Sequence, residues 1–187
     1  MALRRNRAAS AASARILLCL LAGTGLPGLC SGATQQSLEY QVKAAFILNF
    51  TRFIEWPAEA FADSAAPFTI CIFGKNPFGG ALEDVVEGES VGSRKLAIRH
   101  ISQAPAAREC QIVFAGQGEK DLQPLLGSLA PGVLTVGEGD SFLRQGGIIA
   151  FVIDNRRVRF DISQSAAERA ALRLSSKLLS VARSVAR

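Results

Sequence analysis

The stretch GVLTVGEGDSFLRQGGIIAFVIDNRRVRFDIS, residues 132–163, decides the fold. Two of its apolar runs, 148–153 and 158–162, are rich in β-branched and aromatic residues, which favour strands. Between them stand Asp154 and Asn155, followed by two arginines, and this combination is typical of a turn. The stretch therefore predicts a β-hairpin.

The two arms of this hairpin differ in pattern. The second arm alternates apolar residues with Arg159 and Asp161, so we expect one buried face and one wet face. The first arm is apolar on both faces and should lie deeper in a sheet. Gly146 and Gly147 give the backbone the freedom to turn from a short helix, 141–144, into that arm. Nothing in the hairpin is an evident catalytic group.

Upstream, further apolar runs predict strands at 68–73, 96–101, 110–115 and 133–136, with helices near 81–86 and 120–129 between them. The order strand, glycine loop, helix, strand argues for parallel pairing with crossover connections. We therefore predict a single α/β domain with a mixed, mostly parallel sheet, helices on both faces, and a C-terminal hairpin followed by a helix.

Two long helices are expected to flank these strands. The first covers 38–54, capped by Ser37 and stopped by Pro57, and its core-facing stripe is Leu38, Val42, Ala45, Phe46, Asn49, Phe50 and Phe53. The second covers 166–183, where Ser165 and Glu168 have capping-box spacing. Its inward stripe is Ala167, Ala171, Leu174, Leu178 and Val181.

Residues 1–33 have the pattern of a secretory signal peptide. A basic start precedes a short apolar run, 16–22, and small residues at 31–33 suit a cleavage site. A retained anchor is the alternative; a lipoprotein at Cys30 is disfavoured because Leu29 is too large for that signal. We expect the mature domain to be residues 34–187, exported and not inserted in the membrane.

The basic character of the chain belongs to this leader. The chain has 21 Lys and Arg against 16 Asp and Glu, and four arginines but no acidic residue precede Thr34. The remainder carries 17 basic and 16 acidic residues, a net charge of +1. A chain so nearly neutral is not expected to bind nucleic acid.

Two cysteines, Cys71 and Cys110, remain after removal of the leader. An even pair in an exported protein favours a disulfide, although two buried thiols that never meet would give the same sequence. Bridging them would close a loop of about 40 residues and add roughly 3–4 kcal/mol on the chain-entropy model.

Three glycine-rich loops, 74–80, 116–119 and 137–141, follow predicted strands. If the strands are parallel, the loops share one edge of the sheet, where open α/β folds bind ligands. The first loop is a possible anion site through its free amides and its lysine, with Gly74, Lys75, Asn76, Gly79 and Gly80 as the residues concerned. None matches a phosphate motif, and ordinary strand-to-helix turns explain all three equally well.

Catalysis finds little support in the sequence. Gly139-Asp140-Ser141 resembles the block of some serine esterases, but that chemistry needs a histidine base near the serine. The one histidine, His100, lies in a predicted strand, and Asp140 or Ser141 more simply caps the helix that follows. One histidine and no clustered carboxylates leave no metal ligand set. We predict no catalytic residue, no metal and no cofactor.

Arg169, Arg173 and Lys177 are spaced four residues apart and would line one face of the predicted final helix. A solvated helix face is the simple explanation. The other is a basic surface that binds an acidic partner.

Several blocks of the mature chain together resemble the YfiR-like family of periplasmic proteins. The blocks are YQVKAAFILNF at 40–50 with FIEWP at 53–57, ICIFG at 70–74 before NPF at 76–78, GGII at 146–149, RVRFDI at 157–162 and LSSKLL at 174–179. Cys71 and Cys110 fall where cysteines of the family fall. The chain lacks the second cysteine pair that the best-known members carry near the closing hairpin.

The resemblance implies a compact α/β domain, usually a homodimer, without enzymatic activity. The best-known members repress a membrane diguanylate cyclase by holding its periplasmic domain, and so act on cyclic di-GMP and biofilm formation. A periplasmic repressor of this kind is the leading expectation for function. A periplasmic small-ligand binding or sensor protein is the alternative.

Overall fold

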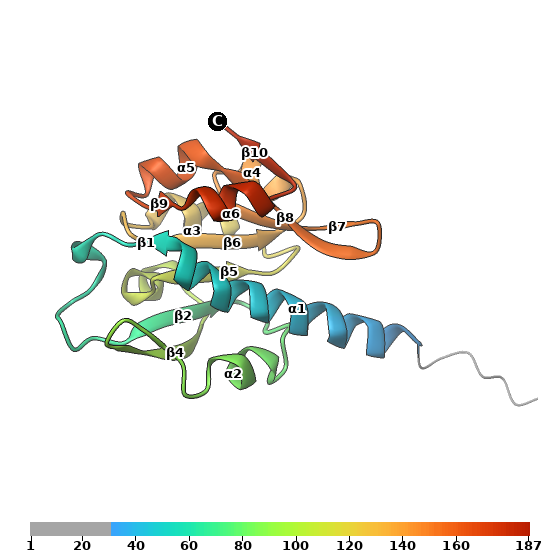
Figure 1. The fold of residues 1–187 in the computed structure, drawn as a ribbon, viewed down its shortest axis with the longest axis horizontal. Helices are drawn as coiled ribbons and strands as arrows, with labels where there is room; N and C mark the ends of the chain where they lie inside the picture. Colours follow the sequence, from blue (N-terminus) through green and yellow to red (C-terminus); the bar gives the residue numbers. More distant parts are fainter. Residues whose placement is uncertain (1–30) are drawn as a thin grey trace, which may run out of the picture.

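The computed structural model describes residues 31–187, with side chains from Leu38 onward. The predicted signal peptide covers 1–33, and residues 1–30 of it lie outside the described part. The centre of the fold is an eight-stranded sheet in the order β10-β8-β7-β6-β5-β2-β4-β3 (Figure 1). Its strands are β2 (Phe68–Phe73), β3 (Ser90–Val91), β4 (Arg94–Ile101), β5 (Ile112–Ala115), β6 (Leu134–Glu138), β7 (Ile149–Asp154), β8 (Arg157–Ser163) and β10 (Ser184–Ala186).

Helices cover both faces of this sheet, as the sequence predicts. The side chains of α1 (Ser31–Phe53), α2 (Ala81–Val86) and α6 (Ser176–Val181) belong to the core on one face. Those of the 3-10 helix η2 (Ala104–Glu109), of α3 (Leu122–Ser128) and of α4 (Ser141–Arg144) belong to the core on the other. The remaining elements are β1 (Ile54–Glu55), the 3-10 helix η1 (Ala58–Ala60), α5 (Gln164–Arg169) and β9 (Arg173–Leu174).

The sheet is mixed and mostly parallel. β4, β2, β5, β6 and β7 pair in parallel, whereas β8 returns antiparallel to β7. The predicted hairpin is therefore confirmed, with the register running from Ile149 opposite Ile162 to Asp154 opposite Arg157. Its two turn residues, Asn155 and Arg156, both have positive φ angles, 48° and 61°. A two-residue turn with this twist matches the twist of the strands that it joins.

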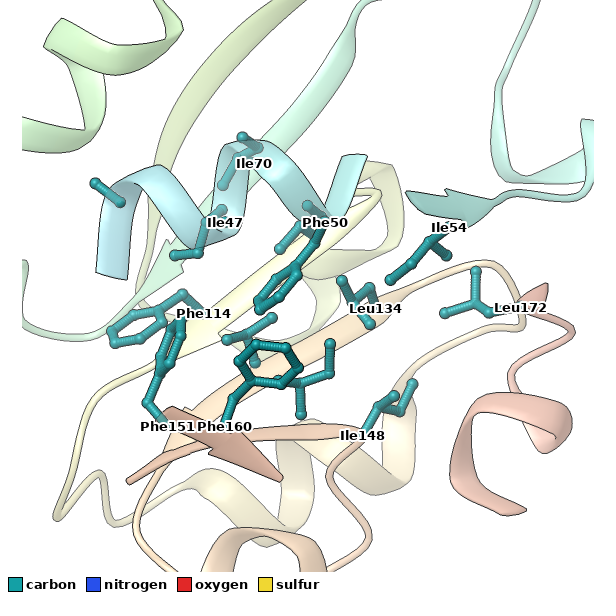
Figure 2. Packing of buried hydrophobic residues seen from close by; sticks show 14 of the residues in the cluster. Ile47, Phe50, Ile54, Ile70, Phe114, Leu134, Ile148, Phe151, Phe160 and Leu172 are labelled. Carbon is teal, nitrogen blue, oxygen red and sulfur yellow. The ribbon is translucent and has the colours of Figure 1, made fainter. Parts of the chain in front are cut away.

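A cluster of phenylalanines joins α1 to this hairpin. Phe50 of α1 lies edge-on to Phe160 of β8, with ring centroids 5.2 Å apart, and stacks on Phe151 of β7 at 5.9 Å (Figure 2). All three side chains are nearly inaccessible to water. Their burial explains how α1 is fixed across the hairpin end of the sheet.

The face of α1 that enters the core differs from the predicted one. The sheet buries Ala44, Ile47, Phe50 and Ile54, each at most 5% exposed. Of the predicted stripe, Leu38, Val42 and Phe53 remain 56%, 38% and 37% exposed, and Ala45 and Asn49 are exposed as well. The helix is apolar on two sides, so periodicity alone does not select the buried side. Ser37 is not the N-cap of α1 either, because the helix begins earlier, at Ser31.

Trp56 fastens the end of α1 to the sheet. Its indole Nε1 donates a hydrogen bond to the carbonyl oxygen of Gln111 at 3.1 Å, and its ring meets Phe68 edge-on at 4.8 Å. Pro57 follows but is not the predicted stop, because α1 already ends at Phe53 and β1 intervenes; the proline is instead the N-cap of η1. The Gln111 side chain in turn accepts from the amide of Thr69 and donates to the carbonyl of Ala60, so one buried amide joins three segments.

The predicted final helix, 166–183, is wrong. α5 ends at Arg169, and Ala171 takes a positive φ of 57°. The amide of Leu172 bonds to the carbonyl of Ala167 and that of Ala171 to the carbonyl of Glu168, which together close a Schellman motif. The chain then forms β9 and a separate helix, α6. The N-cap of α5 also differs from the predicted capping box of Ser165 and Glu168. The cap is Ser163, whose hydroxyl accepts a hydrogen bond from the amide of Ala166.

The predicted wet face of the second hairpin arm is also wrong in part. Asp161 is only 5% exposed, because β10 pairs with β8 beside it and Arg183 covers it. No helix within residues 31–187 combines the length and the apolar character that a bilayer span requires.

Candidate functional site

The three glycine-rich loops share one edge of the sheet, as the sequence predicts. They follow β2, β5 and β6, which are parallel neighbours and so end on the same side. The N-terminal half of α1 closes over this edge. It leaves a cleft of about 590 Å³ lined by Glu39, Tyr40, Lys43, Gln117, Glu138, Gly139, Asp140, Phe151, Val152, Ile153 and Arg183.

A buried lysine organises this cleft. Lys43 is 4% exposed, and its ammonium forms ion pairs with Glu39, one helical turn earlier, and with Glu138 at the end of β6. The second oxygen of Glu138 accepts from the amide of Gln117 at 2.9 Å. The ammonium also lies 4.4 Å from the centroid of the Tyr40 ring. Helix α1 and the strand ends are thus joined through one charge network.

The network changes the acidity of Tyr40. Burial raises the pKa of its phenol, and the charge and hydrogen bonding of Glu138, with the charge of Glu39, raise that pKa further. Tyr40 therefore keeps its proton throughout the physiological range. Sequence reasoning missed Tyr40, Lys43 and Glu138. The signal available was a lysine on an otherwise apolar helix, which alone does not reveal its distant partner, Glu138.

The possible ligand loop already holds a carboxylate of the protein itself. Glu119 accepts from the amide of Lys75 at 3.1 Å, and its carboxylate lies so close to Gly74 that a Cβ there would overlap it. Asn76 accepts from the amide of Phe78 and donates to the carbonyl of Gly79. These loop amides therefore already have hydrogen-bond partners within the protein. Binding of an external anion by Gly74, Lys75, Asn76, Gly79 and Gly80 stays a prediction.

Ser141 and His100, the serine and the histidine that esterase chemistry would need together, do not meet. Ser141 follows β6, whereas His100 lies on β4, and β5 and β2 stand between these strands. Three strand spacings amount to about 14 Å. His100 lies instead 3.5 Å from Glu83 at the surface. Asp140 stands at the N-cap of α4 without a side-chain capping bond and contacts Arg183 at 3.3 Å.

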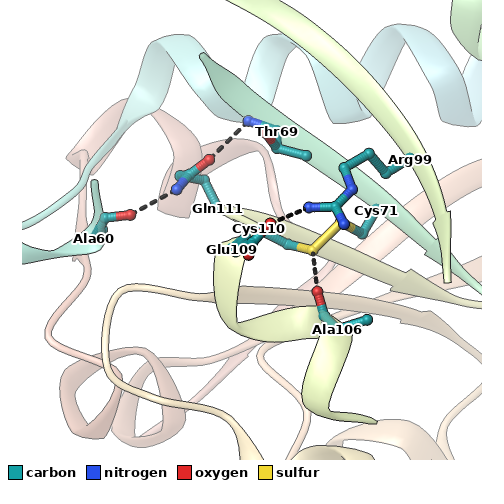
Figure 3. Close-up of a disulfide and its surroundings, with 8 residues drawn as sticks. All are labelled: Ala60, Thr69, Cys71, Arg99, Ala106, Glu109, Cys110 and Gln111. Atoms are coloured by element: carbon teal, nitrogen blue, oxygen red, sulfur yellow. Dashed lines mark hydrogen bonds and ion pairs between the residues drawn. A yellow bond between two sulfur atoms is a disulfide. The ribbon is translucent and has the colours of Figure 1, made fainter. Parts of the chain in front are cut away.

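The predicted disulfide is present. Cys71 of β2 and Cys110, which precedes β5, have Cα atoms 5.9 Å apart and join neighbouring strands (Figure 3). Both are buried, at 0% and 1% exposure, in the core on the side of η2 and α3. The surface ion pair of Arg99 with Glu109 lies beside them (Figure 3). The bridge therefore acts as an internal cross-link of the sheet.

The basic row of the sequence analysis is not a row. Arg169 ends α5, Arg173 lies on β9 and Lys177 lies on α6, so the three do not share a helix face. All three are exposed. The alignment on one helix was wrong because that helix is interrupted at Ala171. Their contact with a partner stays a prediction.

The comparison with protein families decides the relationship. A family model described as YfiR/HmsC-like matches residues 40–183, which is most of the chain. The chain belongs to the YfiR/HmsC-like family. The match begins at Tyr40 in the buried network and ends at Arg183 on the far rim of the cleft. Members of this family are in general regulators without enzymatic activity.

Solved structures support the fold alone. The chain is similar to a conserved domain protein from Vibrio cholerae O1 biovar El Tor, with a TM-score of 0.50 and 10% identity over 78% of this chain and 60% of that one. This chain thus spans 60% of the length of that protein. A bifunctional methylenetetrahydrofolate dehydrogenase/cyclohydrolase from Thermoplasma acidophilum aligns with a TM-score of 0.29 and 14% identity over 82% and 47% of the two chains. No curated protein matches the chain.

Proposed function

We propose that this protein is a non-enzymatic periplasmic regulator. It binds the periplasmic domain of an inner-membrane diguanylate cyclase and represses it, which lowers cyclic di-GMP and biofilm formation. The observation that carries the proposal is the family match over residues 40–183, since the family implies a cyclase partner. The protein acts by contact, as a homodimer, and needs no cofactor.

Two features support a periplasmic site of action. The first 33 residues have the pattern of a secretory leader, and a disulfide joins Cys71 to Cys110. Disulfides persist in the periplasm and are rare in the cytosol.

Action by contact is supported by apolar side chains that the fold leaves accessible, among them Leu38 and Ile153 at 56% and 54% exposure. Both side chains line one groove, and contiguous apolar exposure is typical of surfaces that bind another protein.

Cyclic di-GMP levels in the native organism test the proposal. Deleting the gene should raise cyclic di-GMP, and the full-length chain should restore the low level. A variant that lacks residues 2–33 is the matched control, because it keeps the protein in the cytosol and away from the cyclase's periplasmic domain. Equal cyclic di-GMP with and without the gene would reject the proposal. Co-purification from native envelope then identifies the cyclase.

Arg169, Arg173 and Lys177 remain one possible partner surface. They are exposed and positively charged, although they lie on three elements. Replacing all three with glutamate reverses the charge of this surface with little expected change in stability. Raised cyclic di-GMP in cells with this stably expressed variant would assign them a partner contact, whereas unchanged cyclic di-GMP would leave them as solvated residues.

A small-ligand sensor is the second candidate function, and the cleft around Lys43 is the observation that favours it. A cleft of about 590 Å³ with aromatic and charged walls is the size of many small-molecule sites. Native mass spectrometry of protein taken directly from the periplasm should then show an added small-molecule mass. Asp140→Lys, at an exposed rim position, should remove that mass, whereas Glu87→Lys, outside the cleft, should not.

A further inference from the structure

An apolar groove lies between α1 and the β7–β8 hairpin. We call it the α1–hairpin groove. It measures about 790 Å³ and is lined by Leu38, Glu39, Val42, Phe46, Ile153, Arg156, Arg157 and Val158. The N-terminal half of α1 and the hairpin tip extend from the same side of the molecule (Figure 1). The groove therefore lies at the hairpin end of the sheet, between α1 and the tip.

The groove exposes the helix stripe that the fold does not use. Leu38, Val42 and Ile153 are 56%, 38% and 54% exposed, whereas Phe46 and Val158 are partly buried at its inner side. Phe46 connects the groove to the core, because its ring lies 5.4 Å from that of Phe160. Adjacent apolar side chains left in water on a well-packed scaffold mark a binding surface more often than isolated ones do.

The hairpin tip is built as a projecting arm. Pairing of β7 with β6 stops at Phe151, and pairing of β10 with β8 covers only Asp161–Ser163. Within the tip, Val152 to Arg159 therefore pair only with each other. Ile153, Arg156 and Arg157 of this arm line the groove together with residues of α1.

The rim of the groove on the hairpin side carries two arginines without an ion pair. Within residues 38–187, Arg156 and Arg157 form no ion pair, whereas Glu39, on the α1 side of the groove, is paired with Lys43. Arg156 also holds a positive φ of 61°, at a turn position where glycine is usual. A side chain kept in this costly backbone conformation points to a use for the side chain itself.

We propose that the α1–hairpin groove binds an acidic amphipathic helix of the partner protein. The apolar stripe from Leu38 to Phe46 spans about 12 Å, at about 1.5 Å per residue, and accommodates two turns of a docked helix. Apolar residues of that helix fill the groove, and carboxylates along its edge meet Arg156 and Arg157. A second copy of this chain is a poorer occupant, since a twofold contact would bring two arginine-rich tips together.

The inference rests on the proposed function, because the partner is the periplasmic domain of the cyclase. Its test is calorimetric titration of the exported, disulfide-bonded protein with that purified domain. Ile153→Asp places a charge in the groove, at a position that is not part of the core. It should raise the Kd by about tenfold or more. Val181→Asp is the matched control, since Val181 is 57% exposed and lies outside the groove; its Kd should not change.

The charge of the rim is tested separately. The double variant Arg156→Glu with Arg157→Glu should raise the Kd by about tenfold and reduce the dependence of the Kd on salt concentration. Lys95→Glu with Arg108→Glu makes the same change in net charge on exposed residues of β4 and η2, and should leave the Kd unchanged. Arg156→Gly relieves the strained turn, so it should keep or raise the Tm. It should still raise the Kd, because the arginine side chain is lost.

The outcomes separate the two claims. Binding by wild type that is lost in the groove variants and kept in the controls supports the groove. Binding kept in Ile153→Asp and in Arg156→Gly overturns the groove and leaves the proposed function standing. Failure of the wild-type protein to bind the domain overturns both. The Tm of each variant, measured in parallel, identifies any loss that comes from unfolding, and Arg156→Gly then decides the result.

Discussion

Arg183 and Asp161 form a two-point ion pair that fastens the last strand of the chain to the sheet. The Arg183 Nε donates to one carboxylate oxygen at 2.9 Å, and a terminal guanidinium nitrogen donates to the other. Burial alone would raise the pKa of Asp161, but hydrogen bonds from Arg183 and Ser184 and the charge of Arg183 hold that pKa below its usual value. β10 is thus anchored at the end of β8 by charge as well as by backbone pairing.

We predict that Asp161→Asn lowers the free energy of unfolding by about 1.5 kcal/mol at pH 7, the lower end for a hydrogen bond to a charged group. The folded pKa of Asp161 is below the unfolded value of about 3.9, so this stabilisation is fully present above that pH and is lost as the pH falls through the folded pKa. Denaturant titrations of both proteins should therefore differ at pH 7 and converge in acid. A constant difference down to pH 2 would contradict the assignment.

The network around Lys43 should behave as a buried unit. Lys43→Met leaves the carboxylate of Glu138, whose side chain is 8% exposed, without its counterion and should cost about 3 kcal/mol. Adding Glu138→Gln removes the uncompensated charge and should restore much of that loss. Urea unfolding of the two single variants and the double variant measures this coupling. Additive losses would show that Lys43 and Glu138 act independently.

The disulfide should stabilise the fold and resist reduction in the native state. Replacing both Cys71 and Cys110 with alanine should lower the free energy of unfolding by about 3–4 kcal/mol. Because both sulfurs are buried, dithiothreitol should reduce the bridge only when denaturant opens the domain. Alkylation with mass analysis follows the free thiols. If dithiothreitol without denaturant rapidly made both cysteines available for alkylation, this prediction would be contradicted.

Ala171→Gly should stabilise the protein by about 1 kcal/mol. Ala171 has a φ of 57°, where an L-residue is strained and glycine is not. In a continuous final helix the same change would destabilise by about 1 kcal/mol. The sign of the change in Tm therefore distinguishes the Schellman end of α5 from an unbroken helix. Ala167→Gly, within α5, is the control and should lower the Tm.

The strands of this fold could be predicted because their signals are local. Most apolar runs, such as Phe68–Phe73, have glycine or proline at one end or both, and the polar sequence at Asp154 and Asn155 marks the turn of the hairpin. The glycine loops could be assigned to one edge because parallel pairing follows from the order of elements. The disulfide was predicted from the parity of the cysteines and the leader.

The other features depend on contacts that the sequence does not encode locally. α1 has two apolar sides, and only packing on the sheet selects Ala44 and Ile47 over Leu38 and Val42. The end of α5 was missed because alanine, the strongest helix former, occupies the position where glycine usually signals a stop. The pairing of Lys43 with Glu138 joins residues 95 positions apart, so no local pattern marks it.

Cyclic di-GMP synthesis by the purified cyclase tests the central claim most directly. The cognate full-length cyclase is placed in lipid nanodiscs, which leave both of its sides open, and is supplied with GTP. The account predicts that adding the exported, disulfide-bonded protein lowers the rate of synthesis in a saturable manner, and that a cyclase without its periplasmic domain is unaffected. An unchanged rate at saturating protein, or equal inhibition of the truncated cyclase, would contradict it.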